Sequence, residues 1–456
     1  MVKRPVDLKA VHSYIDQNKK DFVEKLQRLL RQPSVSTNLD DCLKCAELLK
    51  KIMVESGIKA RLMPVKNGPP VVFAELRSRI SKRTLLCYDH YDVKPVDPVD
   101  EWLSDAFGAE IRGNRVYARG ATDNKSGCLA FVFAAEALLR NLEDLPVNLK
   151  FVFEGEEEIG STHLEQWALE NKELLRADGL VSLDGGVDSD TGKPEVGTYG
   201  KGVLYVEFRA KGPREDIHSG SEAMVTNPIW RLVWALNSIK GPNDEILVDG
   251  WYKDLRKPTE EDLASVRDEL VPFDPEETKA QLGTPAFAGD RVGFDLLVHR
   301  RFYGTAAICG IYGGYTKTGM HTVIPKTAFA KMDFRCPPYL DPDVQFKKLR
   351  KHLDDHGFKD IELVKLSARG NAWVTDRNDP VVQAVKRAID RVFPEANLSK
   401  KGTAEGVFRV KLGIPAVMSS FSNADNNLHA PNENCDINYY VRGIKYAASI
   451  MTEFAG

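Results

Sequence analysis

Apolar positions in the first part of the chain form short runs that alternate with helical stretches. Amphipathic helices are predicted over residues 8–31 and 39–56. Four later apolar runs are typical of buried strands and cover residues 71–76, 84–88, 147–153 and 179–183. Helical periodicity over 126–142 and from residue 162 separates these runs. This alternation predicts an α/β fold with a mostly parallel sheet flanked by helices.

The pattern changes after residue 200. Alternating apolar and polar positions predict half-exposed antiparallel strands over 203–210, 305–312 and 327–335. Helical stretches lie near 227–239, 259–270 and 342–356, whereas residues 241–300 as a whole are weakly patterned. The first pattern returns with a helix over 379–392, a strand over 414–418 and a helix over 437–454. We therefore expect a first domain of residues 1–199 and 371–456, into which residues 200–370 insert as an α+β domain.

Composition excludes some classes of partner. A chain of 456 residues exceeds the usual size of a single hydrophobic core, and a composition of 43% hydrophobic and 28% charged residues is ordinary for a globular protein. The net charge of -3, with no basic stripe, argues against a nucleic-acid partner. No apolar stretch has the length that spans a bilayer, so we expect no membrane partner.

The cysteines and the N-terminal residues predict a cytoplasmic protein. Residues 1–22 have no apolar region typical of a secretory signal. Seven cysteines scattered over the chain indicate reduced thiols. Cys42 and Cys45 form a C-x-x-C pair, but they lie in the predicted helix over 39–56 and no second pair follows. This context favours two helical thiols over a zinc or redox site.

Five metal-capable side chains stand at the predicted edges of secondary structure. They are His90, Asp123, Glu158, Asp184 and His429. Three of them follow apolar runs, where a parallel sheet collects its ligands, one precedes an apolar helix, and one lies in a loop before the last helix. Two histidines with three carboxylates suit Zn²⁺ or Mn²⁺, which accept mixed nitrogen and oxygen ligands. Taken singly, each residue could equally be an ordinary polar loop residue.

Neighbouring residues add to this pattern, although each has an ordinary explanation as well. On an extended segment His90 and Asp92 share a face, so the carboxylate can orient the imidazole; a surface pair would look the same. Asp123 could cap the helix that follows it. Four glutamates at positions 154 and 156–158 repel one another unless cations neutralise some of them, although solvated acidic turns are common. In a metal site, one carboxylate binds the ion and its neighbour, Glu157, takes a proton from the attacking water.

Six motifs in order carry a family resemblance over nearly the whole chain. They are HYDVKP, WLSDAF with YARGATDNKSG, FEGEEEIGS, LDGG, DIHSG and NNLHAPNEN. The chain resembles the dinuclear metallopeptidases that include carnosinase-type dipeptidases, acetylornithine deacetylase and succinyl-diaminopimelate desuccinylase, and it is most similar to the carnosinase type.

The resemblance implies two divalent metal ions, Zn²⁺ first and Mn²⁺ or Co²⁺ as alternatives. Asp123 would bridge both ions, with His90 and Asp184 completing one site and Glu158 and His429 the other. Glu157 would be the general base for a metal-bound water that bridges the ions, and Asp92 would orient and polarise His90. The family also holds its bridging aspartate in a cis peptide, here with Asn124.

For the inserted domain, the resemblance implies a lid that also forms a homodimer. His218 would stabilise the oxyanion in the partner subunit's site. Thr322 and Arg335 would bind the substrate carboxylate, for which the planar fork of arginine is suited. Gly402 and Thr403 would also contact substrate, although residues 401–406 read Lys-Gly-Thr-Ala-Glu-Gly where carnosinase-type members carry Glu-Gly-Gly-Ser.

The expected activity is hydrolysis of the peptide bond in dipeptides or other short peptides. Within the family, an aspartate at the position of Asp184 is typical of peptidases, and a glutamate is typical of most deacylases. An N-acyl-amino-acid deacylase is the alternative, favoured by the region around Gly402 and Thr403. A catalytically inactive binding or scaffold relative is a third reading, but such relatives typically lack a ligand or the base, and all are present here.

Overall fold

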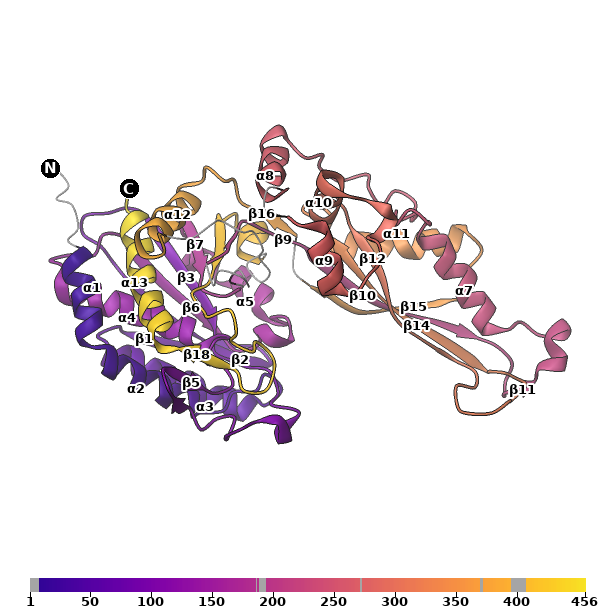
Figure 1. Ribbon diagram of the computed structural model, residues 1–456, viewed down its shortest axis with the longest axis horizontal. Helices are drawn as coiled ribbons and strands as arrows, with labels where there is room; N and C mark the ends of the chain where they lie inside the picture. The colour runs from indigo at the N-terminus through magenta and orange to yellow at the C-terminus, as the bar shows by residue number, and fades with distance from the viewer. Residues whose placement is uncertain (1–7, 186, 188–193, 271–272, 370–371, 395–406) are drawn as a thin grey trace. The chain divides into compact units, whose positions relative to one another are not determined.

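The computed structural model describes residues 8–185, 187, 194–270, 273–369, 372–394 and 407–456. The chain divides into two compact units (Figure 1). The first unit contains Met1–Gly200 and Val374–Gly456, and the second contains Lys201–Trp373. None of the helices in the described ranges combines the length and the apolarity needed to cross a membrane.

The first unit is built on a seven-stranded sheet of order β1-β2-β6-β3-β7-β17-β8. Its strands are β1 (Ala60–Val65), β2 (Gly68–Leu76), β3 (Thr84–His90), β6 (Asn148–Glu154), β7 (Gly179–Ser182), β8 (Val196–Gly197) and β17 (Ala416–Ser419). The four strands β6, β3, β7 and β17 are mutually parallel, whereas β1, β2 and β8 pair antiparallel. The sheet is therefore mostly parallel at its centre, and the carboxyl ends of β3, β6 and β7 meet at one edge.

The predicted strand over 71–76 lies in β2, and it does not join the parallel set. A short turn connects it to β1, and no helix separates it from β3, so it lacks the crossover connection that a parallel neighbour requires.

Helices surround this sheet: α3 packs on β1 and β2, α4 on β3, and α12 on β7 and β17. The helices of the first unit are α1 (Leu8–Gln17), α2 (Lys19–Leu30), α3 (Leu39–Glu55), α4 (Lys125–Asn141), α5 (Leu164–Glu170), α6 (Lys172–Leu175), α12 (Pro380–Val392) and α13 (Ile437–Glu453). Helix α4 is buried on all sides from its first residue to Leu138, as expected of a helix that is apolar all round. It therefore fixes the loop before it, which contains Asp123.

The single helix predicted over 8–31 is two helices, α1 and α2, that meet at Asn18. The Asn18 side-chain amide donates a hydrogen bond to the carbonyl oxygen of Tyr14 at 2.8 Å. Such a side-chain bond competes with the helical ladder of the main chain and favours a break.

Small sheets join distant parts of the chain. One has the order β18-β5-β4 and contains β4 (Glu110–Arg112), β5 (Arg115–Tyr117) and β18 (Asn434–Asp436). Pairing of β18 with β5 carries the loop that includes His429 to the segment that leads to Asp123. Where the two units join along the chain, β9 (Tyr199–Gly200) pairs with β16 (Trp373–Val374).

The second unit has a four-stranded antiparallel sheet of order β12-β14-β10-β15. Its strands are β10 (Gly202–Lys211), β12 (Thr305–Gly313), β14 (Thr327–Cys336) and β15 (Glu362–Arg369), and a separate pair consists of β11 (Ile217–His218) and β13 (Val323–Ile324). Alternate residues of β10 and β14 are buried against α7 (Pro228–Ile239) and α11 (Pro342–Asp355). This confirms the antiparallel pattern predicted for three of the strands.

In the described part of the weakly patterned residues 241–300, three α-helices begin. They are α8 (Glu260–Leu270), α9 (Pro275–Leu282) and α10 (Gly293–Phe302). Only the first was predicted, because α9 is short and offers few apolar positions. The start of α9 nevertheless carries a helix-capping signal. Asp274 accepts hydrogen bonds from the main-chain N–H groups of Glu276 and Glu277, and Pro275 occupies the first turn.

Candidate active site

His90 is the last residue of β3 and is buried, with 1% of its side chain exposed. Its Nδ1 lies 3.1 Å from the carbonyl oxygen of Asp92 and 3.3 Å from the Oδ1 of that residue. The Asp92 carboxylate also accepts the main-chain N–H groups of Glu157 and Glu158, each at 3.1 Å, and the hydroxyl of Ser36 at 2.7 Å. One buried carboxylate therefore connects the end of β3 to the 3-10 turn η2 (Glu157–Ile159) that follows β6.

The five metal-capable side chains form two groups that share Asp123. One group is His90, Asp123 and Asp184, and the other is Asp123, Glu158 and His429; within each, one ligand atom per residue lies within 4.8 Å of the others. The Nε2 of His90 is 3.0 Å from Oδ1 of Asp123, and the Nε2 of His429 is 2.7 Å from Oδ2. Each oxygen of Asp123 thus faces a different histidine, which is the arrangement of a carboxylate that bridges two ions.

The donors in both groups fit divalent cations. Nε2 of His90 and Oε1 of Glu158 are buried, and neither has a hydrogen-bond partner among the described residues. The Nδ1 of His90 is already directed at Asp92, so its Nε2 remains available as a ligand atom. Buried polar atoms of this kind are costly unless something satisfies them. Two imidazoles with three carboxylates match the mixed donor set that zinc accepts.

The same cluster of carboxylates shifts the pKa values of the two histidines. Hydrogen bonds to Asp123 and Glu158 raise the pKa of His429 to about 10. Burial opposes charge on His90, but its contacts with Asp123, Asp184 and Asp92 raise its pKa well above the ordinary value. The two imidazoles are therefore protonated at neutral pH when no cation neutralises the carboxylates.

The carboxyl groups diverge in acidity. Burial raises the pKa of Asp123, but its contacts with the two histidines bring the pKa below its ordinary value. Burial, followed by the charge of Asp123, raises the pKa of Asp184. Burial is also the main cause that raises the pKa of Glu157 well above its ordinary value; His90 lowers it, and the charges of Asp184, Asp123 and Asp92 raise it further. Glu157 is thus a half-buried carboxyl group that can hold a proton.

The acidic run after β6 does not act as a single charged turn. Glu154 accepts hydrogen bonds from Tyr88 and from Ser161, the latter at 2.8 Å. Glu156 lies 3.0 Å from Nδ1 of His163. These two glutamates have partners away from the candidate metal groups, whereas Glu158 belongs to one of those groups and also pairs with Lys94 at 3.0 Å.

Glu433 holds the loop that carries Asp123, and nothing in the sequence pattern indicated this role. Its buried carboxylate accepts the main-chain N–H groups of Gly120, Thr122 and Asp123 at 3.0, 2.8 and 3.0 Å, and a guanidinium N–H of Arg119 at 2.8 Å. The hydrogen bond to Asp123 spans 310 residues of sequence. The only available signal was the position of Glu433 inside the same short motif as His429.

Asp89 and Asn124 form a second support that the sequence did not reveal. Asn124 stands at the N-cap of α4 without a side-chain capping bond, and its amide instead donates to Oδ1 of Asp89 at 2.9 Å. The same oxygen accepts the Ser182 hydroxyl at 3.0 Å and the main-chain N–H of Leu183 at 3.1 Å. The Asp123–Asn124 peptide bond is cis. Asp89 therefore connects β3, the start of α4 and the end of β7.

The candidate residues for substrate contact do not belong to the two groups around Asp123. Gly402 and Thr403 are outside the described residues. In the second unit, His218 is exposed at the end of β11, and the carbonyl oxygen of Thr322 accepts the N–H of Ser219 at 3.0 Å, so these two candidates are close. Arg335 lies near the opposite end of β14 and pairs with Asp333 at 2.9 Å. At about 3.4 Å per residue, it is about 27 Å along the strand from the end nearest Thr322, so one copy of this unit does not bring them together.

Comparison with known proteins gives consistent results. The model of "Peptidase family M20/M25/M40" matches residues 86–453, a range that includes all five candidate ligands. The chain is 30% identical to the Beta-Ala-His dipeptidase of Homo sapiens over 99% of its own length and 93% of that protein. It is 29% identical to the Cys-Gly metallodipeptidase DUG1 of Saccharomyces cerevisiae over 98% of each chain. A solved M20 family metallo-carboxypeptidase from Sulfolobus solfataricus is 34% identical, with a TM-score of 0.85 over 95% of this chain and 99% of that one.

These matches confirm the resemblance drawn from the six motifs, and they confirm the expected fold class. The relatives are covered over nearly their full length, so the likeness concerns the whole protein and not one module. The chain therefore belongs to the peptidase family M20/M25/M40 and is a metallopeptidase.

Proposed function

We propose that this protein hydrolyses dipeptides or other short peptides with two bound divalent cations, Zn²⁺ first among them. The observation that carries the proposal is the position of Asp123 between two groups of ligands, with one oxygen toward each histidine. The names of two similar relatives, a Beta-Ala-His dipeptidase and a Cys-Gly metallodipeptidase, support dipeptides as the substrate class.

His90 and Asp184 hold one cation, Glu158 and His429 hold the other, and Asp123 contributes to both. Bound divalent cations supply a water of lowered pKa and a polarised scissile carbonyl group. The ions would then lie at the carboxyl ends of β3, β6 and β7, where parallel sheets bind their ligands.

Glu157 is the general base in this proposal. It takes the proton of the attacking water and passes it to the departing amine, a role that requires a carboxyl group able to hold a proton near neutral pH. Burial, the first cause that raises the pKa of Glu157, supports this role. Asp92 is a positioning residue, since it binds His90 and also fixes the main chain of Glu157.

Two related reactions compete with dipeptide hydrolysis. The similarity to a metallo-carboxypeptidase favours removal of a C-terminal residue from longer peptides. Hydrolysis of N-acyl amino acids is the other alternative. All three need a group that binds a carboxylate, and Arg335 is the candidate, since half of its side chain is exposed.

A panel of substrates separates these activities. Purified enzyme with Zn²⁺, Mn²⁺ or Co²⁺ is tested against dipeptides, tetrapeptides with a free C-terminus, and acetylated and succinylated amino acids, and metal content is measured in the same preparations. We expect the highest kcat/KM for dipeptides and at least two ions per chain. Faster hydrolysis of acylated amino acids would contradict the proposed substrate class, and hydrolysis without metal would contradict the proposed chemistry.

We also propose a homodimer in which His218 and Thr322 of one subunit complete the site of the other. Their distance along the sheet from Arg335 supports this arrangement. Exposed apolar side chains of the second unit offer an interface: Trp230 and Trp234 of α7, and Ile308, Ile311 and Tyr312 of the edge strand β12.

Mixing two inactive variants tests the shared site. His218→Ala and Glu157→Gln enzymes are each inactive alone, but a mixed dimer has one site with both residues intact. Random exchange of subunits should restore about a quarter of wild-type activity. Mixtures that stay inactive although mass spectrometry detects mixed dimers would show that His218 serves its own subunit.

A cytoplasmic location is also proposed, because all seven cysteines are free, and six of them are buried. Reduced thiols of this kind are usual in a reducing compartment. Cell fractionation tests this, and recovery of the protein from an oxidising compartment would contradict it.

A further inference from the structure

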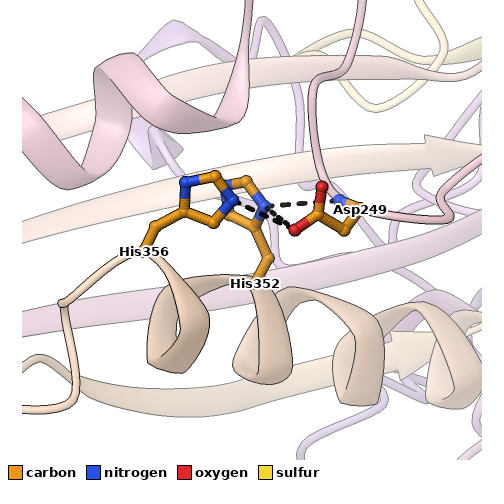
Figure 2. Close-up of side chains that lie close together, drawn as sticks. All are labelled: Asp249, His352 and His356. Atoms are coloured by element: carbon orange, nitrogen blue, oxygen red, sulfur yellow. Dashed lines mark hydrogen bonds and ion pairs between the residues drawn. The ribbon is translucent and has the colours of Figure 1, made fainter.

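The second unit contains another group of metal-capable side chains, formed by Asp249, His352 and His356 (Figure 2). His352 lies in the last turn of α11, and His356 follows at its C-cap, so the spacing of four residues places both rings on one side of the helix. Asp249 lies in the segment between α7 and α8. Each residue offers one ligand atom, and these atoms lie within 4.8 Å of one another.

Hydrogen bonds define which nitrogen of His352 carries the lone pair. Its Nε2 is 3.1 Å from the carbonyl oxygen of Ser238, to which it donates, and its Nδ1 accepts the main-chain N–H of Asp249 at a long 3.3 Å. The ring is therefore neutral with its lone pair on Nδ1, and burial followed by the charge of His356 lowers its pKa. A metal-binding histidine usually donates its other ring N–H to a carbonyl in the same way.

The lone pair of His352 accepts the one long hydrogen bond from the N–H of Asp249, which a bound cation would replace, and it also faces an acceptor. Its Nδ1 lies 3.4 Å from Oδ2 of Asp249, and the same oxygen lies 3.0 Å from Nε2 of His356. Figure 2 shows the two rings directed at the carboxylate from α11. The ring N–H of His356 can satisfy the oxygen, but no proton lies between the oxygen and Nδ1 of His352. Two acceptors at this distance repel each other, and a cation between them removes the repulsion.

The distances suit a tetrahedral ion. With bonds of about 2.0–2.1 Å, two ligands of tetrahedral zinc stand about 3.3–3.4 Å apart. The observed separations of 3.4 and 3.0 Å are close to this value. Asp249 and His356 are 61% and 45% exposed, so an ion has access from solvent, while the buried His352 provides a fixed ligand.

We propose that Nδ1 of His352, Nε2 of His356 and Oδ2 of Asp249 bind a further divalent cation of the zinc type. The ion would tie the segment between α7 and α8 to the end of α11, and water would fill its remaining position. This site goes beyond the proposed peptidase function and does not depend on it, because it shares no residue with the groups around Asp123.

Zinc titration of the full chain tests the proposal. The protein is stripped of metal with a chelator, dialysed, and titrated with Zn²⁺ by calorimetry, with zinc content measured after gel filtration. Wild-type protein should bind three equivalents. Asp249→Asn and His356→Gln should each bind two, with the third weakened more than about tenfold, since even residues that only orient a ligand contribute about 10–100-fold to affinity. Both changes are at exposed positions, so the fold should persist.

Asp254→Asn is the matched control. Asp254 belongs to the same segment and also contacts α11, through Lys348 at 2.8 Å, but no histidine is involved, so this variant should bind three equivalents. Equal stoichiometry in wild type, Asp249→Asn and His356→Gln would overturn the proposal and identify the group as a hydrogen-bonded ion pair. If the groups around Asp123 bind fewer ions than expected, the difference of one equivalent between wild type and these variants remains, so the two proposals fail separately.

Discussion

Replacement of Glu433 by glutamine should weaken both the stability of the first unit and its affinity for metal. The native carboxylate accepts four N–H groups, from Arg119, Gly120, Thr122 and Asp123. Glutamine retains one acceptor oxygen, which can serve Thr122 and Asp123. The glutamine NH₂ group then faces the N–H groups of Arg119 and Gly120, so donors face donors there. The charge of Arg119 also loses its partner.

The size of the effect follows from burial. The side chains of Arg119 and Glu433 are 1% and 0% exposed, so water cannot replace the lost partner. Removal of one member of a buried ion pair typically costs about 3–5 kcal/mol, because it leaves an uncompensated charge in the interior. Glu433 does not itself belong to either metal group. It fixes the main chain at Asp123, and residues that orient a ligand in this way contribute about 10–100-fold to metal affinity.

Urea unfolding followed by circular dichroism, with and without Zn²⁺, measures the loss of stability, and calorimetric titration measures the affinity. Asp425→Asn is the control, because Asp425 pairs with Arg115 at 2.8 Å while 66% of its side chain is exposed, and such a pair contributes about 0–1 kcal/mol. A Glu433→Gln variant as stable as Asp425→Asn would refute the argument from burial. A destabilised variant with unchanged zinc affinity would refute the positioning role.

Three further predictions concern the base, the metal and a surface ion pair. Glu157→Gln should retain the metal content of the wild type and lose about 10²–10⁴-fold in kcat, measured with the best dipeptide; near-normal turnover would exclude Glu157 as the base. Removal of metal by a chelator should abolish hydrolysis, and stoichiometric Zn²⁺ should restore it, whereas activity that persists in metal-free protein would contradict a metallopeptidase. Burial opposes charge on Glu453, but hydrogen bonds from Arg391 and Arg387 lower its pKa. Its contribution of about 0.2–1 kcal/mol is therefore present above the unfolded pKa of about 4.3 and disappears as the pH falls through the lower folded value. Thermal unfolding of Glu453→Gln should show a lower Tm than wild type at pH 7 and an equal Tm below pH 3, and a difference that persists in acid would contradict the assignment.

The positions of the candidate ligands followed from the sequence because they depend on a general property of parallel sheets. Apolar runs predicted β3, β6 and β7, and the carboxyl ends of parallel strands meet at one edge. His90, Glu158 and Asp184 therefore had to lie near one another once the strands were recognised. The two remaining candidates, Asp123 and His429, stand beside predicted helices, and the family resemblance assigned them to the same site, because no periodicity predicts that they meet.

The supporting residues could not be predicted in this way. Glu433 accepts three main-chain N–H groups, which any residue type can supply, so the sequence of these partners carries no signal. Asp89 accepts the side chains of Asn124 and Ser182, which are distant in sequence, so no local pattern predicts these contacts. The pair of Asp249 and His352 also depends on tertiary packing, since 103 residues separate them along the chain. Local patterns predict elements and their ends, whereas contacts of this kind depend on how the elements pack.

The supporting residues and the candidate ligands respond differently when metal is removed from the first unit. Protein donors satisfy both carboxylate oxygens of Glu433 and Oδ1 of Asp89, so these hydrogen bonds hold the loop around Asp123 without metal. Among the described residues, protonated histidines and Lys94 are the groups that neutralise Asp123 and Glu158. Metal binding must displace those protons, so affinity should rise with pH. Zinc at 100 times its dissociation constant should then stabilise the first unit by about 2.7 kcal/mol per site. Hydrogen exchange with and without Zn²⁺ should show this gain in β3, β7 and α4. Equal protection in the two states would contradict the expected stabilisation of this unit by the ions.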